Sequence, residues 1–562
     1  MSGEITLVVG IGMMVVALAT ASAQEPPNDI DLSIVPPERF TGEPYELAGK
    51  RIVFTSWYFI RPGGYAWKNE KGENVTVTRS LPVGPWDAHF ERKWDTPRGV
   101  RIVAQRPHRY GPVIRSENPW DQKAISIRQV LKDGEKYRAW GGVEDAKSRV
   151  HMAYYESDDG LDWRRPKLGL LEYAGSKENN LIEQFPGGVF IDPTAPPEER
   201  YKSVGGEVEI SFSEFKQFAA RHPDRWEPRA LRADRKMQKP ILTLHGFVSA
   251  DGLTWRKLPE PFTVEHSDTQ VVAGYNAQRK KYFIFTRNYF VGPRAVAAPR
   301  DPYMMSWLGE LNGSGRRSIG YTESDRFGDF PVSQLVLAPR TDMGPSQLLY
   351  TNCYTTIPGA PDHHLLFPTV WDTTTDATHL EMAASHDGRV WNWVPGGSLM
   401  ETQAFGEFDG GCIFWSPNLI ELKNGDFALP YTGFAFPHKY PRTLWRYDWG
   451  YAIWPRGRIV ALEAPETGEF TTVGLMPPGR TLRINALTAR AGFIRVAVST
   501  RDGAFLPGRS FDDSIPIVGD QYRTIVQWKG DPPVADLGYE PGQPICLRFQ
   551  MDRARIFGLE FE

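Results

Sequence analysis

A chain of 562 residues exceeds what one hydrophobic core usually holds, so we expect two domains, or one large ring of repeats with an appended domain. The formal charge of −3 creates no field that favours nucleic acid or an anionic membrane, and both kinds of partner are excluded. Aromatic residues make up 12% of the chain, beside 53 Gly and 46 Pro, which favours an all-β, turn-rich protein that binds ring-shaped ligands.

The N-terminus predicts export. An apolar run over residues 7–18 precedes Ala21-Ser22-Ala23, an A-x-A cleavage pattern, so residues 1–23 are predicted to be a cleaved signal peptide. The stretch before this run holds Glu4 and no Lys or Arg, which departs from the usual positive start and leaves a retained anchor as the alternative. We therefore expect a secreted or periplasmic protein with no membrane span after cleavage. Residues 24–110 form a predicted N-terminal extension and β preamble that caps or closes the repeats that follow.

One short phrase recurs along the chain, over residues 157–163, 249–255 and 385–391, with a degenerate copy from Glu323. Each copy follows an apolar run typical of a strand and reads Ser-x-Asp-Gly-x-x-Trp. The Ser and Asp side chains can bond local backbone amides, the Gly takes a positive φ and the Trp packs back. We interpret the phrase as a turn between strands and assign structural roles to Asp159, Asp251 and Asp387. Self-similar units of this size predict a propeller.

The repeats predict a five-bladed β-propeller over residues 111–463, with blades that begin near residues 112, 180, 262, 345 and 400. The second blade carries an insertion in which Ser211 and Glu214 fit a capping box, so a short helix is expected there. From residue 464 to 562 short alternating strands separated by Gly and Pro predict a β-sandwich. The fold class is therefore all-β, a five-bladed propeller followed by a sandwich.

The chain holds few candidate metal ligands. Cys353, Cys412 and Cys546 are sparse and odd in number, so we expect buried free thiols and not a disulfide framework. Zinc motifs are missing from the sequence, and His363 and His364, as neighbours on a strand, point to opposite faces. No metal site is predicted.

Two stretches resemble exported bacterial proteins similar to glycoside hydrolase families 32 and 43: residues 157–180, with Arg165-Pro166-Lys167-Leu168-Gly169, and residues 508–530 in the tail. The resemblance implies a five-bladed propeller whose central funnel holds the active site, and glycoside cleavage by carboxylates. It implies no cofactor and leaves a Ca²⁺ ion in the funnel open. The family-32 opening Trp-Asn-Asp-Pro-Asn-Gly is absent, which argues against a fructan-type assignment.

Carboxylates just before the innermost strand of a blade project into such a funnel. Asp121 is therefore the candidate base or nucleophile and Asp268 the second candidate, while Glu407 or Asp409 is the candidate general acid. The competing interpretation is that each residue caps a turn.

Six further residues are candidates for substrate binding, through ring stacking or through contacts to hydroxyl and acidic groups, with packing as the competing account. They are Trp140, Arg287, Tyr289, Asp362, His363 and His364.

The sequence thus predicts a secreted glycoside hydrolase that acts on a plant or algal polysaccharide or its oligosaccharides. Two alternatives remain open: a polysaccharide lyase that uses His, Tyr and Arg, and a glycan-binding propeller without catalysis. The fold alone does not choose between them, and linkage, stereochemistry and oligomeric state stay open.

Overall fold

The computed structural model describes residues 43–62, 67–68, 74–75, 97–183, 187–227, 241–265, 267, 269–290, 316–439, 444, 446–501, 503–531 and 535–562. The predicted signal peptide lies outside these residues. Residues 45–562 form one unit by their contacts. Regular structure in the described part is almost entirely β, with one α-helix and three short 3₁₀ helices (Trp57–Phe59, Pro197–Glu199 and Pro455–Gly457), so the all-β prediction is confirmed.

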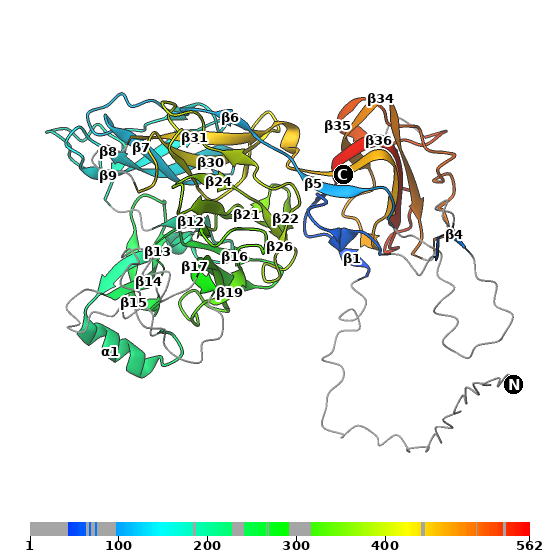
Figure 1. Cartoon of the computed structure of the whole chain (residues 1–562). Coiled ribbons are helices and arrows are strands. Elements are labelled where there is room, and N and C mark those ends of the chain that lie inside the picture. The colour runs from blue at the N-terminus through cyan, green and yellow to red at the C-terminus, as the bar shows by residue number, and fades with distance from the viewer. Residues whose placement is uncertain are drawn as a thin grey trace, which may run out of the picture. The chain divides into compact units, whose positions relative to one another are not determined.

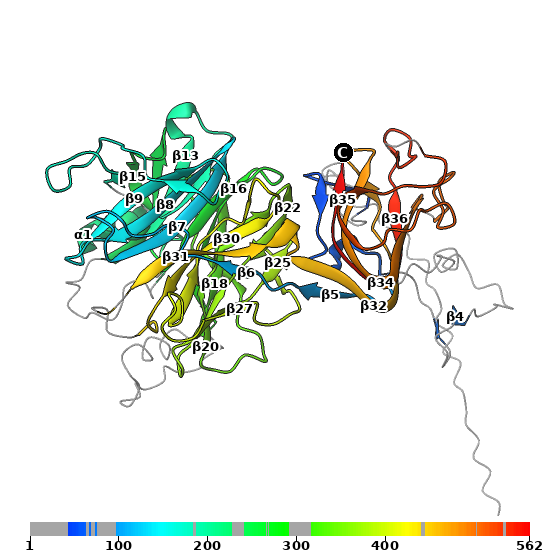
Figure 2. The ribbon, with the colours of Figure 1, turned by 90° about the horizontal axis from the view of Figure 1, so that it is seen from above.

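Five groups of antiparallel strands follow one another along the chain, and we number them sheets 1 to 5 (Figures 1 and 2). Sheet 1 contains β7 (Ala124–Asp133), β8 (Lys136–Glu144), β9 (Val150–Ser157), β10 (Trp163–Arg164) and β11 (Leu181–Ile182). Sheet 2 contains β12 (Gly188–Ile191), β13 (Tyr201–Ile210), β14 (Ile241–Ser249) and β15 (Arg256–Thr263). Sheet 3 contains β16 (Val272–Asn276), β17 (Lys281–Phe290), β18 (Arg316–Ser324) and β19 (Gln334–Leu337).

Sheet 4 is split into two ladders because each of its first three strands breaks for two residues. One ladder contains β20 (Gln347–Thr351), β23 (Thr369–Asp372), β24 (Thr378–Leu380) and β27 (Met400–Glu401). The other contains β21 (Tyr354–Ile357), β22 (Ala360–Leu366), β25 (Ala383–Ser385) and β26 (Asn392–Trp393). Sheet 5 contains β28 (Cys412–Trp415), β29 (Ile420–Glu421), β30 (Phe427–Phe434), β31 (Tyr447–Trp454) and β6 (His108–Tyr110).

The recurring phrase forms the same turn in sheets 1, 2 and 4. In each copy the Asp Oδ1 accepts bonds of 2.8 and 2.9 Å from the amides two and three residues further on. The Gly has a φ of 85°, 78° or 73°, which a side chain would strain. Trp163 and Trp391 donate from Nε1 to the carbonyl of that Gly at 3.0 Å. The predicted structural role of Asp159, Asp251 and Asp387 is confirmed.

Hydrogen bonds between neighbouring sheets join all five in a closed circuit, since sheet 5 is bonded back to sheet 1. Trp140 Nε1 donates to Gly252 O at 2.7 Å between sheets 1 and 2, and Tyr282 Oη donates to Asp192 Oδ2 at 2.7 Å between sheets 3 and 2. Asn352 Nδ2 donates to Gln270 O at 2.9 Å between sheets 4 and 3, and Ile413 N donates to Thr378 Oγ1 at 2.7 Å between sheets 5 and 4. Ser416 Oγ donates to Ile127 O at 2.6 Å and so joins sheet 5 to sheet 1. Each of the five sheets is therefore hydrogen-bonded to the next one in the circuit.

The last strand of sheet 5 comes from the region before sheet 1. β6 pairs with β31 in the register Arg109 to Ala452, and Arg109 Nε lies 3.3 Å from Asp409 Oδ2. Residues 108–110 thus complete a sheet whose other strands begin 300 residues later. The sequence predicted that residues 24–110 form an N-terminal extension and β preamble that caps or closes the repeats; within this stretch, β6 pairs with β31.

A sixth sheet contains the C-terminal strands in the order β35 (Asp520–Ile525), β34 (Leu482–Ser499), β36 (Cys546–Phe561), β32 (Val460–Thr471) and β5 (Arg101–Ala104), with β2 (Arg51–Ile52) also paired to β36. We call it the C-terminal sheet. Side chains of β34 alternate between buried and half-buried up to residue 488, which is the pattern of a sheet with one core face. β1 (Tyr45–Glu46) pairs with β33 (Leu475–Met476), and β3 (Trp67–Lys68) with β4 (Asn74–Val75).

Helix α1 (Phe212–Arg221) follows β13. Ser211 Oγ accepts from Glu214 N, and the Glu214 carboxylate accepts from Ser211 N, so the predicted capping box is present. Phe215 and Phe218 bury the inner face of the helix. Among the described residues no helix has the length and apolar character to cross a membrane. The three cysteines are buried free thiols, as predicted.

Candidate functional site

Asp121 lies in the turn before β7 with its carboxylate fully buried. Its Oδ1 accepts from the amides of Glu117 at 3.0 Å and Asn118 at 2.8 Å, and its Oδ2 lies 2.9 Å from Nη2 of Arg165. Both oxygens are thus engaged in holding the turn and in pairing with an arginine. This geometry is that of the turn-capping alternative.

Asp409 and Glu407 lie in one loop before β28 in different surroundings. Glu407 is exposed, whereas the Asp409 carboxylate is fully buried. Asp409 accepts from Gln403 Nε2 at 2.6 Å and Tyr431 Oη at 2.9 Å, beside the Arg109 guanidinium of β6. Asp409 therefore ties the closing strand β6 to sheet 5.

Asp268 lies outside the described residues, but its neighbours are described. Glu265 is fully buried, and its carboxyl group accepts bonds from Thr263 Oγ1 at 2.8 Å and from Ser333 Oγ. Burial raises the pKa of Glu265 to about 7, and the charge of Glu227 acts in the same direction. Two residues on, Ser267 Oγ accepts from Arg287 N at 3.1 Å. The segment that leads into β16 therefore carries a carboxyl group and contacts β17.

Trp140 is on β8, the second strand of sheet 1, and is fully buried. Its indole packs in a cluster with Tyr154 and Tyr201, between sheets 1 and 2, and donates to Gly252 O. A ring enclosed on all sides packs the core and has no face for a sugar.

Asp362, His363 and His364 lie on β22, where sheet 4 meets the N-terminal segment. Asp362 accepts from Tyr45 Oη at 3.0 Å and from His363 Nδ1 at 2.9 Å, and His363 Nε2 accepts from Val53 N at 3.3 Å. These bonds hold an interface inside the protein. Burial by itself raises the pKa of Asp362. The bonds from His363 and Tyr45 stabilise its carboxylate, however, and the pKa is lowered to about 2.

His364 points the other way, as expected for its neighbour on a strand. Its Nδ1 lies 2.7 Å from Tyr354 Oη, and the two rings are stacked. Burial lowers the pKa of His364 to about 4, so the ring is neutral at physiological pH. Both histidines thus bond to neighbouring protein groups. In the part of the chain that the structure describes, no three or more His, Cys, Asp or Glu residues are grouped as metal ligands.

The end of β17 that carries Arg287 and Tyr289 has no partner in β16, because the pairing between the two strands stops at Phe285. Both are buried, and the Arg287 guanidinium lies over the Tyr289 ring at 4.9 Å. Arg317 is opposite Tyr289 on β18, and its guanidinium lies 3.9 Å from the ring centre of Tyr350 on β20. Two arginines thus gather at this end of sheets 3 and 4.

Four half-buried aromatic rings continue from Tyr350 across sheet 5, and we call them the aromatic row. Tyr350, Phe414, Phe434 and Tyr447 follow one another with ring centres 5.1, 5.6 and 5.2 Å apart. They come from β20, β28, β30 and β31. Partly exposed rings with hydrogen-bonding ends are the side chains on which sugar rings stack.

Each end of the aromatic row carries a polar group. At the first end, His438 Nε2 lies 2.8 Å from Tyr350 Oη. At the other end, Tyr447 Oη donates to Glu144 Oε2 at 3.2 Å, and the Lys123 ammonium is paired with Glu144 Oε1. Burial raises the pKa of Tyr447, so the phenol stays protonated and donates. The row therefore joins sheets 4, 5 and 1 and ends at the carboxyl group of Glu144.

Sequence reasoning missed the aromatic row and Glu144. The carboxylates predicted from the sequence precede the expected innermost strands, whereas Glu144 ends β8 and contacts a strand that begins at residue 447. The local signal was the pair Glu144-Asp145 at a strand end. Only the pairing of sheets 1 and 5 shows that Glu144 meets Tyr447.

No family model matches the chain, and no curated protein matches it. One similar solved structure is an α-L-arabinofuranosidase from Podospora anserina in complex with cellotriose, with a TM-score of 0.34 and 10% identity over 62% of this chain and 96% of that one. A thermostable family-43 glycoside hydrolase has a TM-score of 0.34 and 12% identity over 60% and 92%. An N-acetylgalactosamine deacetylase from F. plautii, in complex with blood group B trisaccharide, has a TM-score of 0.30 and 11% identity over 71% and 96%.

Proposed function

We propose that this protein is a glycoside hydrolase that cleaves a plant or algal polysaccharide or its oligosaccharides along the aromatic row. The observation that carries the proposal is the row itself, four half-buried rings that end at the Glu144 carboxylate. Stacking rings bind and orient a sugar, and a carboxylate beside them supplies the charge that glycoside cleavage requires.

The fold proposed for this function is a five-bladed β-propeller in which sheets 1 to 5 are the blades and the aromatic row lies at the mouth of the central funnel. The C-terminal sheet belongs to a β-sandwich. The closed circuit of bonds between the sheets supports this arrangement. We further propose export by the N-terminal signal, which N-terminal sequencing of the mature protein tests.

In the proposed reaction, Glu144 is the base or nucleophile. Its carboxyl group is paired with the Lys123 ammonium and accepts a hydrogen bond from the Tyr447 hydroxyl. Asp268 is the general acid that protonates the leaving oxygen, while Glu144 activates water or attacks the anomeric carbon. Asp121 and Asp409 are assigned to the structure of their loops. No cofactor enters this chemistry.

The test is a screen of the purified chain against neutral, uronate-containing and sulfated polysaccharides, with reducing ends and ultraviolet absorbance read together. We expect new reducing ends without absorbance, and losses of at least about 100-fold in Glu144→Gln and Asp268→Asn, the scale of lost acid–base catalysis. Exposed Glu407→Gln is the matched control and keeps full activity. Full activity in Glu144→Gln contradicts the assignment of Glu144.

A polysaccharide lyase is the second candidate, and one observation favours it. His438, Tyr350 and Arg317 lie together, with the His–Tyr bond at 2.8 Å and the guanidinium 3.9 Å from the Tyr350 ring centre. In a lyase the arginine neutralises the uronate carboxylate, and the Tyr–His pair removes the proton at the adjacent carbon. The carbon–oxygen bond to the leaving sugar then breaks and the leaving oxygen takes a proton. Ultraviolet absorbance that is lost in His438→Gln, and unchanged in Glu144→Gln, selects this candidate.

A further inference from the structure

A hollow lined by none of the four rings of the aromatic row lies where the β7–β8 turn, the β29–β30 turn and β35 come together. It has a volume of about 580 Å³, within the range of small-molecule sites. Its lining includes Lys132 and Lys136 of sheet 1, Lys423 of sheet 5, and Tyr522 and Arg523 of the C-terminal sheet. We call it the lysine cleft.

The charges of this lining leave an excess of cations. Of its acids, Asp158 accepts from Arg164 Nη2 at 3.1 Å, and Glu421 pairs with Arg51 at 3.3 Å. Glu135 is the third acid of the lining and stands against three lysines. Ammonium groups on flexible stems around a hollow attract anionic groups, because each can turn toward the ligand.

The back wall of the lysine cleft is built from bonded groups. Arg523 has a φ of 53°, a conformation that costs energy in a residue with a side chain, and it donates to Glu560 Oε1 at 3.1 Å. Gly425 has a φ of 86°, and a Cβ at this position would lie 2.2 Å from Tyr522 Oη. The backbone of sheet 5 thus approaches the Tyr522 ring closely, which fixes the ring.

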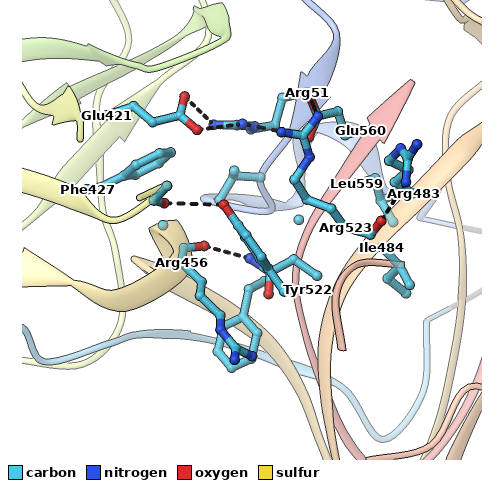
Figure 3. A pocket seen from close by; sticks show the side chains of 16 residues that line it. Arg51, Glu421, Phe427, Arg456, Arg483, Ile484, Tyr522, Arg523, Leu559 and Glu560 are labelled. Carbon is cyan, nitrogen blue, oxygen red and sulfur yellow. Dashed lines mark hydrogen bonds and ion pairs between the residues drawn. The ribbon is translucent and has the colours of Figure 1, made fainter. Parts of the chain in front are cut away.

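Figure 3 shows what lies behind this wall. A small cavity of about 30 Å³, room for one water molecule, lies between Arg51, Glu421, Glu560 and Arg523. Tyr522 also lines this cavity. Arg51 pairs with both Glu421 and Glu560, so its guanidinium joins sheet 5 to the C-terminal sheet. Tyr522 therefore has a bonded, packed support on one side, and its other side lines the open cleft.

We propose that the lysine cleft is a second carbohydrate-binding site, and that its ligand is an oligosaccharide carrying sulfate or carboxylate groups. Lys132, Lys136 and Lys423 bind the anionic groups, and the half-buried Tyr522 ring supports a sugar ring. The proposal rests on the proposed function only in taking the ligand to be a carbohydrate. A site of this kind holds a charged stretch of the polymer while another stretch occupies the aromatic row.

The experiment is calorimetric titration of the full chain with a dextran sulfate oligosaccharide, and with uncharged dextran of the same length. We expect binding of the sulfated probe alone, weakened about tenfold or more in the triple variant Lys132→Gln, Lys136→Gln, Lys423→Gln, which removes three charge contacts. The control triple variant replaces Lys147, Lys167 and Lys177, exposed lysines elsewhere on sheet 1 and the segment after it, and keeps its affinity within about twofold.

Equal weakening in the two triple variants overturns the proposal, since it means unspecific attraction, and so does no binding of the sulfated probe at low salt. If the first triple variant does not fold, Lys423→Gln alone replaces it, with about threefold weaker binding expected. Binding is read without catalysis, so the two proposals fail separately. Binding in the lysine cleft by a protein that cleaves no polysaccharide supports this site and counts against the hydrolase.

Discussion

The buried His364 makes the protein sensitive to acid. In the folded chain its pKa is lowered from 6.5 to about 4, first by burial and then by repulsion from His363. In the unfolded chain the ring binds a proton as the pH falls below its ordinary value, whereas the folded ring stays neutral. Falling pH thus favours the unfolded state from about pH 6.5 down to about pH 4, below which the folded ring is protonated as well.

The size of the effect follows from the shift. A shift of one pKa unit corresponds to about 1.4 kcal/mol, so His364 removes at most about 3 kcal/mol of the free energy of unfolding. Between about pH 7.5 and about pH 5 the loss from this residue alone is about 2 kcal/mol. The substitution His364→Asn keeps a hydrogen-bonding group for Tyr354 and cannot be protonated in this range.

The assay is urea unfolding followed by Trp fluorescence, at both pH values, for the wild type, His364→Asn and the exposed control His108→Asn. The absolute stability of His364→Asn is lower, but its loss between the two pH values is smaller than that of the wild type by about 2 kcal/mol. The control loses as much as the wild type. An equal loss in wild type and His364→Asn refutes the reasoning, because the proton uptake then lies elsewhere.

Three other substitutions test the fold. Gly425→Ala places a Cβ 2.2 Å from the Tyr522 hydroxyl at a φ of 86°, and we expect it to lower the free energy of unfolding in urea by more than about 2 kcal/mol. Gly397→Ala, with a φ of 66° and open space around it, costs only about 1 kcal/mol. Asp409→Asn weakens the pairing with Arg109 of β6, lowers the free energy of unfolding by about 2 kcal/mol and speeds amide exchange in residues 108–110. The control Asp520→Asn, at an exposed ion pair, costs under about 1 kcal/mol. Similar costs for the two variants contradict the role given to Asp409. Trp140→Phe loses the 2.7 Å bond between sheets 1 and 2 and leaves a cavity, so the urea midpoint falls by an amount equivalent to about 2 kcal/mol, and an unchanged midpoint counts against this contact.

The sequence alone determined the features that depend on neighbouring residues. The Ser-x-Asp-Gly turns were predictable because the Asp accepts from amides two and three residues away, and the cap of α1 because Ser211 and Glu214 lie one turn apart. The opposite directions of His363 and His364 follow from the two-residue period of a strand. The all-β class follows from repeated patterns of this kind.

Only the tertiary structure decided which distant segments meet. The pairing of β6 with β31 and of β5 with β32 joins residues hundreds of positions apart, and strand edges carry no code for a particular partner. The same limit applied to the site. Asp121 and Asp409 lie just before β7 and β28, but the partner that each carboxylate meets comes from another segment of the chain, here Arg165 and Arg109. Glu144 and Tyr447 become neighbours only when sheet 5 packs against sheet 1, so their contact is a property of the closed circuit.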